Sequence, residues 1–170
     1  MKIKLVLILL AAAFCTLQAS EDNLIRNDEF KEQKKYWFMS GPATFDKGVA
    51  TLPLTVVRKK DPSTVTASVS QRIDNIKPGK YEFSAYYKGE FRNLYIVMRG
   101  FTKENKSVNI IVKWLGKKDF IKASDKPGWF KFFYQGTIPA NVVRATIHIE
   151  PWGTKGQTIA VTGVEVAEAE

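Results

Sequence analysis

Few residues in this 170-residue chain could carry out catalysis or bind a metal. It contains one histidine, His148, and one cysteine, Cys15. One histidine excludes a metal site built from several histidines, and one cysteine excludes both a disulfide framework and a cysteine zinc site. A Ser-His-acid triad would have to use His148, and no Gly-x-Ser-x-Gly sequence is present to expose a serine. The sequence therefore predicts no catalytic residue, no metal ligand and no cofactor.

Carboxyl groups offer the other familiar route to catalysis. Glycoside hydrolysis needs two of them facing each other, about 5 to 9.5 Å apart. Most acidic residues here fall in turns or near the termini, and those inside predicted strands are Glu82, Glu150 and Glu165. A solvated position on the outer face of a strand explains each of these three. We therefore expect no enzyme.

Aromatic side chains on the polar face of a strand could bind sugars. Sugars have C–H faces that pack on rings and hydroxyl groups that pair with planar polar groups. Alternation over residues 81–88 directs Tyr81, Phe83 and Tyr87 inward and Tyr86 outward. The same reasoning applied to residues 94–100 and 142–150, with two tryptophans near strand ends added, gives a candidate binding surface of Tyr86, Tyr95, Arg99, Trp114, Arg144, His148 and Trp152.

Packing competes with binding as the explanation of these residue types. Most aromatic residues alternate with other apolar ones, so Trp37, Phe83, Trp129 and Phe132 are expected in the core. His148 is equally consistent with an ordinary polar residue on the open face of a strand. Trp114 and Trp152 could stack on a sugar or could close the end of a sandwich.

The elements that must position these residues are strands. Segments of alternating apolar and polar residues, separated by turn signals, cover residues 65–73, 81–88, 94–100, 108–115, 129–138, 142–150 and 157–166. Gly48 is expected to supply a positive φ in a hairpin turn, and residues 165–170 are expected to form a frayed tail. No amphipathic helix is evident. The pattern predicts an all-β fold, an antiparallel β-sandwich or jelly roll, with one domain over residues 21–170.

The first twenty residues have the layout of a secretory signal peptide. Lys2 and Lys4 form a basic start, residues 5–15 are apolar, and small residues follow up to a cleavage point after Ala19 or Ser20. Phe14 before the cysteine argues against lipoprotein processing. Loss of this leader removes the cysteine and two lysines, which lowers the net charge from +9 to +7. The mature chain is predicted to be secreted or periplasmic, with no membrane span.

Three phrases, in order along the chain, resemble the carbohydrate-binding modules of the galactose-binding-like jelly-roll superfamily, especially the family 4/9/22 type. They are Asn23-Leu24-Ile25-Arg26-Asn27-Asp28-Glu29-Phe30, then Ile76-Lys77-Pro78-Gly79-Lys80-Tyr81-Glu82-Phe83-Ser84-Ala85-Tyr86-Tyr87-Lys88-Gly89, then Gly128-Trp129 with Thr137-Ile138-Pro139. The resemblance implies a jelly-roll fold and a sugar-binding role, with a solvent-side aromatic at Tyr86. It says less about the ligand, because this superfamily holds many unrelated binders.

The chain departs from that family at the positions of its structural calcium. The resemblance places an acidic residue after the first Phe and an Asp near the last strand, where this chain has Lys31 and the phrase Val161-Thr162-Gly163-Val164. Calcium needs several oxygen ligands, carboxylates among them. We therefore expect no tightly bound calcium.

Two classes of function follow from these observations. The first is an exported, non-catalytic carbohydrate-binding module for an acidic or β-linked glycan, with a polysaccharide or cell-surface glycan as its partner. The second is a structural or protein-interaction sandwich without a sugar site. The +7 charge suits acidic glycans, whereas export and the absence of a matching motif argue against nucleic acid. Either kind of protein could belong to a larger extracellular assembly.

Overall fold

The structure, a computed structural model, describes residues 23–169. They form twelve strands and one 3-10 turn: β1 (Phe38–Ser40), β2 (Thr44–Asp46), β3 (Val49–Pro53), β4 (Val56–Arg58), β5 (Asp61–Thr66), β6 (Ser68–Asp74), β7 (Gly79–Glu90), β8 (Asn93–Thr102), β9 (Ser107–Gly116), η1 (Lys117–Asp119), β10 (Phe130–Ile138), β11 (Val142–Gly153) and β12 (Thr158–Glu168). The predicted signal peptide, residues 1–20, lies outside the described residues. Across residues 23–169 no α-helix occurs, and hence no helix that could span a membrane.

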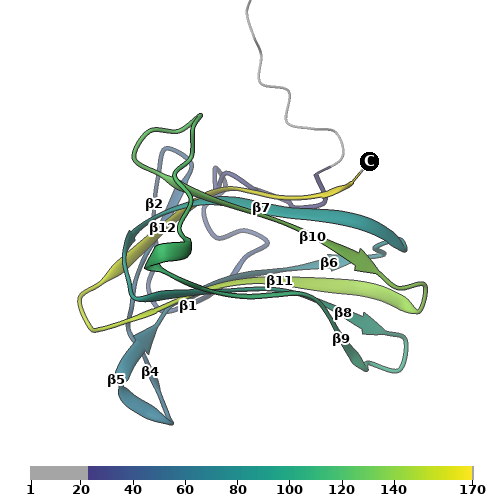
Figure 1. Cartoon of the computed structure of the whole chain (residues 1–170), viewed down its shortest axis with the longest axis horizontal. Coiled ribbons are helices and arrows are strands. Elements are labelled where there is room, and N and C mark those ends of the chain that lie inside the picture. The colour runs from purple at the N-terminus through teal and green to yellow at the C-terminus, as the bar shows by residue number, and fades with distance from the viewer. Residues whose placement is uncertain (1–22, 170) are drawn as a thin grey trace, which may run out of the picture.

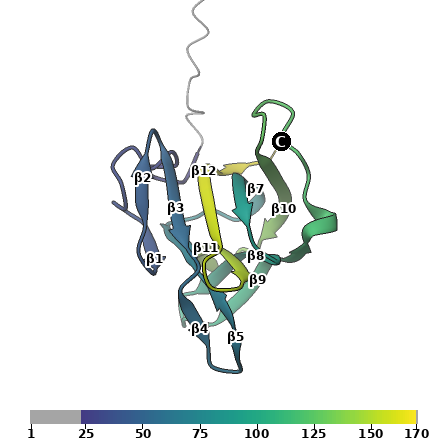
Figure 2. The same ribbon diagram turned by 90° about the vertical axis from the view of Figure 1, so that its left-hand side faces the viewer.

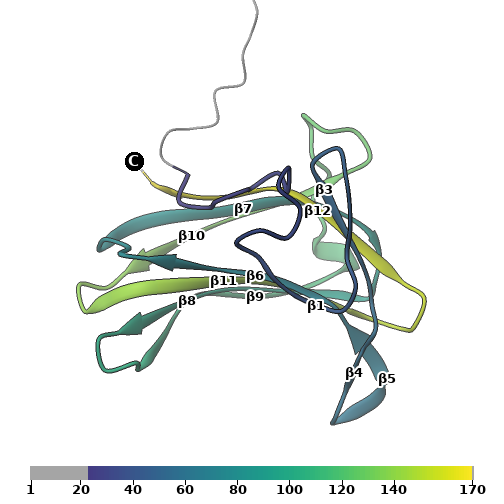
Figure 3. The ribbon, with the colours of Figure 1, turned by 180° about the vertical axis from the view of Figure 1, so that it is seen from behind.

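The strands form two antiparallel sheets stacked face to face (Figure 1). In the five-stranded sheet the order is β10-β7-β12-β3-β2. In the seven-stranded sheet β11 is central, pairing with β8 on one side and with β6 and β5 on the other; β9 lies beyond β8, β1 beyond β6 and β4 beyond β5. The hairpin β4–β5 projects from the seven-stranded sheet on the side away from the five-stranded one (Figures 1 and 3). This layering confirms the predicted β-sandwich.

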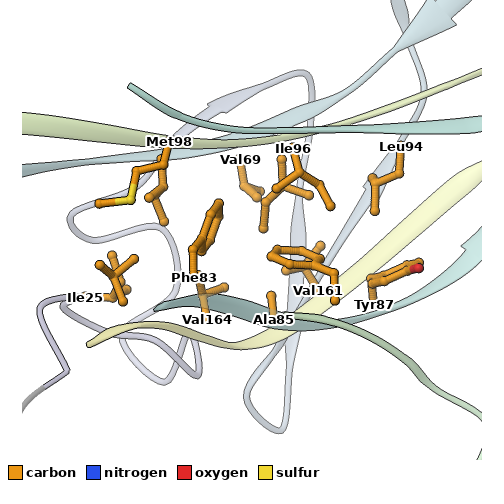
Figure 4. Packing of buried hydrophobic residues seen from close by; sticks show 14 of the residues in the cluster. Ile25, Val69, Phe83, Ala85, Tyr87, Leu94, Ile96, Met98, Val161 and Val164 are labelled. Carbon is orange, nitrogen blue, oxygen red and sulfur yellow. The ribbon is translucent and has the colours of Figure 1, made fainter. Parts of the chain in front are cut away.

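Alternation along each strand explains the core. In β7 the side chains of Tyr81, Phe83, Ala85 and Tyr87 are all at most 1% exposed. From the facing sheet, β8 contributes three fully buried side chains to the same core: Leu94, Ile96 and Met98. Figure 4 shows the two sets pointing toward each other between the sheets. The predicted inward direction of Tyr81, Phe83 and Tyr87 is therefore confirmed, because a period of two puts every second side chain on one face.

The turn between β2 and β3 has the geometry that its sequence predicts. Lys47 and Gly48 have φ values of 46° and 79°, and two successive positive values are typical of the tight hairpin turn that suits twisted strands. A Cβ at position 48 would come within 2.9 Å of the Glu29 carbonyl oxygen. Glycine at this position is therefore required by both the backbone angle and the space available.

The N-terminal segment before β1 lies beside the second half of β12, because β3 pairs only with residues 158–161 of that strand. The Leu24 amide donates to the Val166 carbonyl at 2.8 Å, and the Asn23 carboxamide accepts from Val166 N–H and donates to the Val164 carbonyl. Further along, Trp37 is 6% exposed and its indole N–H donates to the Asn27 carbonyl at 2.9 Å. Hydrogen bonds to β12 at one end and burial of Trp37 at the other thus hold this segment, which lies beside β12 (Figure 2).

Several features differ from the sequence-based prediction. Residues 65–73, expected as one strand, are divided between β5, which ends at Thr66, and β6, which begins at Ser68. Residues 165–168 are not a frayed tail, because β12 runs to Glu168 and pairs there with Tyr81, whose hydroxyl donates to the Glu168 carboxylate at 3.1 Å. The three-residue strands β1, β2 and β4 were not predicted at all. They are too short for a periodic signal, and distant partners in the sequence hold them in place.

Candidate ligand-binding face

The outer face of the seven-stranded sheet carries most of the predicted site; we call it the candidate face. Cross-strand pairing sets its rows, because directly opposite residues point to the same side of a sheet. One row runs Trp114, Tyr95, Glu150, and the next begins at Val97 and continues through His148 and Ser70 to Phe38 at the sheet edge. In the third row Arg99 stands opposite Thr146, which stands opposite Arg72.

One end of the candidate face is aromatic. The rings of Tyr95 and Trp114 lie 5.7 Å apart, and those of Trp114 and Trp152 lie 4.8 Å apart in an edge-to-face arrangement. Trp114 is 49% exposed, which is high for a large apolar side chain. The indole N–H of Trp152 is buried without a hydrogen-bond partner among the described residues. These three rings form an open apolar corner where the strands β8, β9 and β11 meet.

An arginine from the projecting hairpin closes one side of this corner. The guanidinium of Arg58, on β4, lies 4.2 Å from the ring centroid of Trp152 and 3.3 Å from the Glu150 carboxylate. The second carboxylate oxygen of Glu150 lies 2.8 Å from His148 Nε2. Glu150 is therefore held between a cation on one side and an imidazole on the other, with its side chain only 13% exposed.

A hollow of about 300 Å³ occupies the middle of the candidate face. Its lining is mixed, with an aromatic ring, an aliphatic side chain, two aliphatic hydroxyl groups, an imidazole and a guanidinium; the residues around it are Ser70, Tyr95, Val97, Arg99, Thr146, Ile147 and His148. Sites for small polar ligands typically combine apolar walls with a few directed polar groups. This hollow has that character.

The far end of the candidate face is basic. Arg99 donates to the Asn109 side chain at 3.2 Å, and Arg144 donates to the Asn105 side chain while its guanidinium lies 5.1 Å from the Phe101 ring centroid. None of the ion pairs found within residues 23–169 includes Arg99 or Arg144. Both arginines thus keep a positive charge available to an anionic group.

Six of the seven predicted residues lie on the candidate face: Tyr95, Arg99, Trp114, Arg144, His148 and Trp152. That they bind a ligand stays a prediction. Tyr86 does not share this face. Tyr86 is on β7 of the five-stranded sheet, opposite Lys131 and Thr162, and so points away from the other sheet. The outward direction was right, but alternation within one strand does not indicate which sheet the strand joins.

Tyr86 instead takes part in a basic and aromatic cluster. Its hydroxyl donates to the Asp125 carboxylate, and the ammonium groups of Lys126 and Lys131 lie 5.3 and 4.8 Å from its ring centroid. Burial, followed by the hydrogen bond to Asp125, raises the pKa of Tyr86, and the same hydrogen bond lowers the pKa of Asp125. This contact anchors the segment before β10 to the outer face of the five-stranded sheet.

Arg58 and Phe38 are functional candidates that the sequence did not reveal. Arg58 reaches the aromatic corner only because β5 pairs with the end of β11, where Thr66 stands opposite Trp152. Phe38 is 71% exposed and reaches the edge of the face only through the pairing of β1 with β6. Neither pairing leaves a local signal in the sequence.

Metal-binding residues do not gather in the described part of the chain, where no group of three or more His, Cys, Asp or Glu residues is found. At the calcium positions of the resembling modules, Lys31 pairs with Glu29 at 2.6 Å and the Thr162 hydroxyl donates to the Gly48 carbonyl at 2.6 Å. The absence of tightly bound calcium stays a prediction.

No protein-family model matches the sequence, and no curated protein matches it either. Solved structures do match by shape. A CBM4 carbohydrate-binding module has a TM-score of 0.61 and 15% identity, covering 85% of this chain and 99% of the module. A complex of TmCBM61 with β-1,4-galactotriose has a TM-score of 0.57 and 12% identity, covering 86% and 99%.

A third match is the N-terminal cellulose-binding domain of β-1,4-glucanase C from Cellulomonas fimi. It has a TM-score of 0.51 and 11% identity, covering 79% of this chain and 90% of the domain. At such low identities these similarities concern the fold. The chain therefore has the β-sandwich jelly-roll fold of carbohydrate-binding modules, as its sequence predicted. The family 4/9/22 type stays a prediction.

Proposed function

We propose that this protein is an exported, non-catalytic module that binds an acidic or β-linked glycan on the candidate face. The observation that carries the proposal is the exposed corner of Tyr95, Trp114 and Trp152 beside a hollow lined by polar groups. Aromatic rings offer apolar area for sugar C–H faces, and the neighbouring arginine, histidine and hydroxyl groups offer directed hydrogen bonds.

The acidic form of the ligand is favoured by charge. Arg99 and Arg144 are free of ion pairs among the described residues, and the chain carries a net charge of +7 once residues 1–20 are removed. The β-linked form is supported by analogy only. Of the fold neighbours, TmCBM61 is in complex with β-1,4-galactotriose and the Cellulomonas fimi domain is a cellulose-binding domain. A β-linked acidic polysaccharide would satisfy both arguments.

The proposal of a non-catalytic role rests on the side chains of the candidate face. Hydrolysis of a glycosidic bond needs an acid and a second carboxylate on opposite sides of the bond. Beside the hollow stands the carboxylate of Glu150, and both of its oxygens are engaged by Arg58 and His148. Asp74, opposite Arg144 on the same face, pairs with Arg72 at 2.7 Å. The solved structures of similar fold that are named above are binding modules. Recognition without cleavage is therefore the activity we propose.

Localisation and organisation belong to the same proposal. The leader sequence at residues 1–20 supports a secreted or periplasmic protein, and residues 21–170 are proposed to form one domain. The proposed partner is a polysaccharide or cell-surface glycan, and the protein could belong to a larger extracellular assembly. Nucleic acid is not a proposed partner.

A glycan array tests the function directly. The mature chain, residues 21–170, should bind at least one acidic or β-linked glycan, and Trp114→Ala should weaken that binding roughly tenfold, a loss of about 1.4 kcal/mol. Phe133→Ala is the matched control, because Phe133 is 52% exposed but lies on the five-stranded sheet. Binding to no glycan would contradict the proposal.

The alternative, a protein-interaction sandwich without a sugar site, is favoured by one observation. Ile121 and Phe133 are 68% and 52% exposed and line a second hollow, of about 460 Å³, beside the edge strand β10. Under this alternative the array is negative, and Phe133→Ala rather than Trp114→Ala weakens binding to the protein partner.

A further inference from the structure

The edge of the seven-stranded sheet next to β6 carries a groove that the proposed glycan site does not use. Its volume is about 610 Å³, and the N-terminal segment and the second half of β6 line it: Leu24, Arg26, Tyr36, Phe38, Gln71, Arg72, Ile73, Asp74 and Asn75. Leu24, Tyr36 and Phe38 are 36%, 44% and 71% exposed. Three large apolar side chains are therefore left open to solvent in one place.

The backbone fixes the two aromatic rings of this groove. Trp37 is buried and held by the hydrogen bond from its indole, so its neighbours Tyr36 and Phe38 point the opposite way. Tyr36 has a φ of 69°, a conformation that costs about 1 kcal/mol or more for a residue other than glycine. The chain thus presents the Tyr36 ring to solvent despite backbone strain.

The groove is basic and firmly built. The Arg26 guanidinium lies 5.4 Å from the Tyr36 ring centroid, and it takes part in none of the ion pairs within residues 23–169. Gln71, 3% exposed, accepts from the Arg26 amide and donates to the Arg26 carbonyl, both at 2.9 Å. These two bonds fix the N-terminal segment against β6.

The groove is continuous with the candidate face. Phe38 stands opposite Ser70, which stands opposite His148, so one row of side chains joins the groove to the central hollow. Ser70 lines the hollow and Phe38 lines the groove. The strands along this path are β9, β8, β11, β6 and β1, so four inter-strand spacings separate β9 from β1, a distance of roughly 19 Å across the sheet.

From this continuity we propose that the glycan site extends past the edge of the seven-stranded sheet and into this groove. A glycan chain that stacks on Trp114 crosses β8, β11 and β6 and enters the edge groove, where a sugar unit packs on Phe38 and Tyr36. An acidic substituent on that unit would meet Arg26. This inference rests on the proposed function, and it assigns the edge groove a ligand, a continuation of the same polysaccharide.

Binding measured against ligand length tests the inference. The probes are β-1,4-linked oligomannuronates, which are acidic, and cello-oligosaccharides, which are neutral, each from dimer to octamer, titrated calorimetrically into the mature chain. We expect the affinity to rise with length. The double variant Tyr36→Ala/Phe38→Ala should weaken binding of the longest bound oligomer roughly tenfold and leave the shortest unchanged.

Matched variants separate the possible outcomes. Trp114→Ala should weaken binding at every length, and Phe133→Ala at none. A double variant that binds the octamer as well as the wild type, or that loses the same factor at every length, overturns the extended site and leaves the proposed function standing. If the wild type binds neither series, the extended site is overturned, whereas the proposed function is decided separately by the glycan array. Because Tyr36 and Phe38 are exposed, the double variant should melt at the wild-type temperature.

Discussion

At the scale of single residues, Tyr87 places a hydroxyl group in the core without a partner. Its side chain is fully buried among Phe91, Phe120, Phe130 and Phe132, and its oxygen has no hydrogen-bond partner among the described residues. A buried, unpaired polar group costs about 1 to 3 kcal/mol. The same burial raises the pKa of Tyr87.

Tyr87→Phe should therefore stabilise the protein, since it removes the unpaired oxygen and keeps the ring. We expect a gain of about 1 kcal/mol and a rise in Tm of a few degrees at neutral pH, measured by thermal unfolding. A raised pKa in the folded state means that stability is lost as the pH rises above the unfolded value of about 10. The variant should lose less stability than the wild type at alkaline pH. A lower Tm at neutral pH would show that the oxygen does have a partner.

The direction of most side chains at the site could be predicted from the sequence, for a simple reason. A period of two decides on which side of its own strand a residue lies, and that was sufficient for Arg99 and His148. It does not decide which strands are neighbours. Tyr86 was therefore correctly directed outward but assigned to the wrong surface, and Arg58 was missed because it comes close to Trp152 only through the folded hairpin.

At the scale of the elements, the pairing of β7 with β12 depends on Gly89. Its φ is 140°, and a Cβ there would lie 2.2 Å from the Thr158 carbonyl oxygen. Gly89→Ala therefore forces the two strands apart in addition to straining the backbone. We expect a loss of about 3 kcal/mol in the free energy of unfolding, measured by urea denaturation.

Gly156→Ala is the control for that loss. Gly156 also has a positive φ, 93°, but a Cβ there would have no atom within 4 Å. Only backbone strain should remain, about 1 kcal/mol. Equal losses in the two variants would contradict the role we assign to the contact between Gly89 and Thr158.

Long strands were predictable as elements, whereas the short ones were not. β7, β8 and β11 each span ten or twelve residues, enough to show alternation and to fix the sandwich. β1 and β4 have three residues each and exist because β6 and β5 offer them free edges. Those two short strands bring Phe38 and Arg58 to the candidate face, so the parts of the site that escaped prediction are the parts built by long-range pairing.

At the scale of the whole molecule, positive charge is spread over both outer faces. Arg99 and Arg144 lie on the candidate face, whereas Lys126 and Lys131 lie around Tyr86 on the opposite side. The net charge of the chain therefore does not indicate where an anionic polymer binds. Charges that are close to the bound ligand dominate, because interactions between exposed charges are screened beyond about 10 Å at 0.1 M salt.

Salt dependence should therefore identify the face that meets an acidic glycan. Raising the ionic strength from about 0.05 M to about 0.5 M should weaken binding of an oligomannuronate roughly tenfold, because screening shortens the reach of Arg99 and Arg144. Arg99→Gln and Arg144→Gln should each reduce this salt dependence, measured by calorimetric titration. Lys131→Gln, beside Tyr86 on the opposite face, should leave it unchanged. An oligomannuronate affinity that is the same at both salt concentrations would reject recognition of the acidic groups by Arg99 and Arg144, since stacking on Trp114 does not depend on charge.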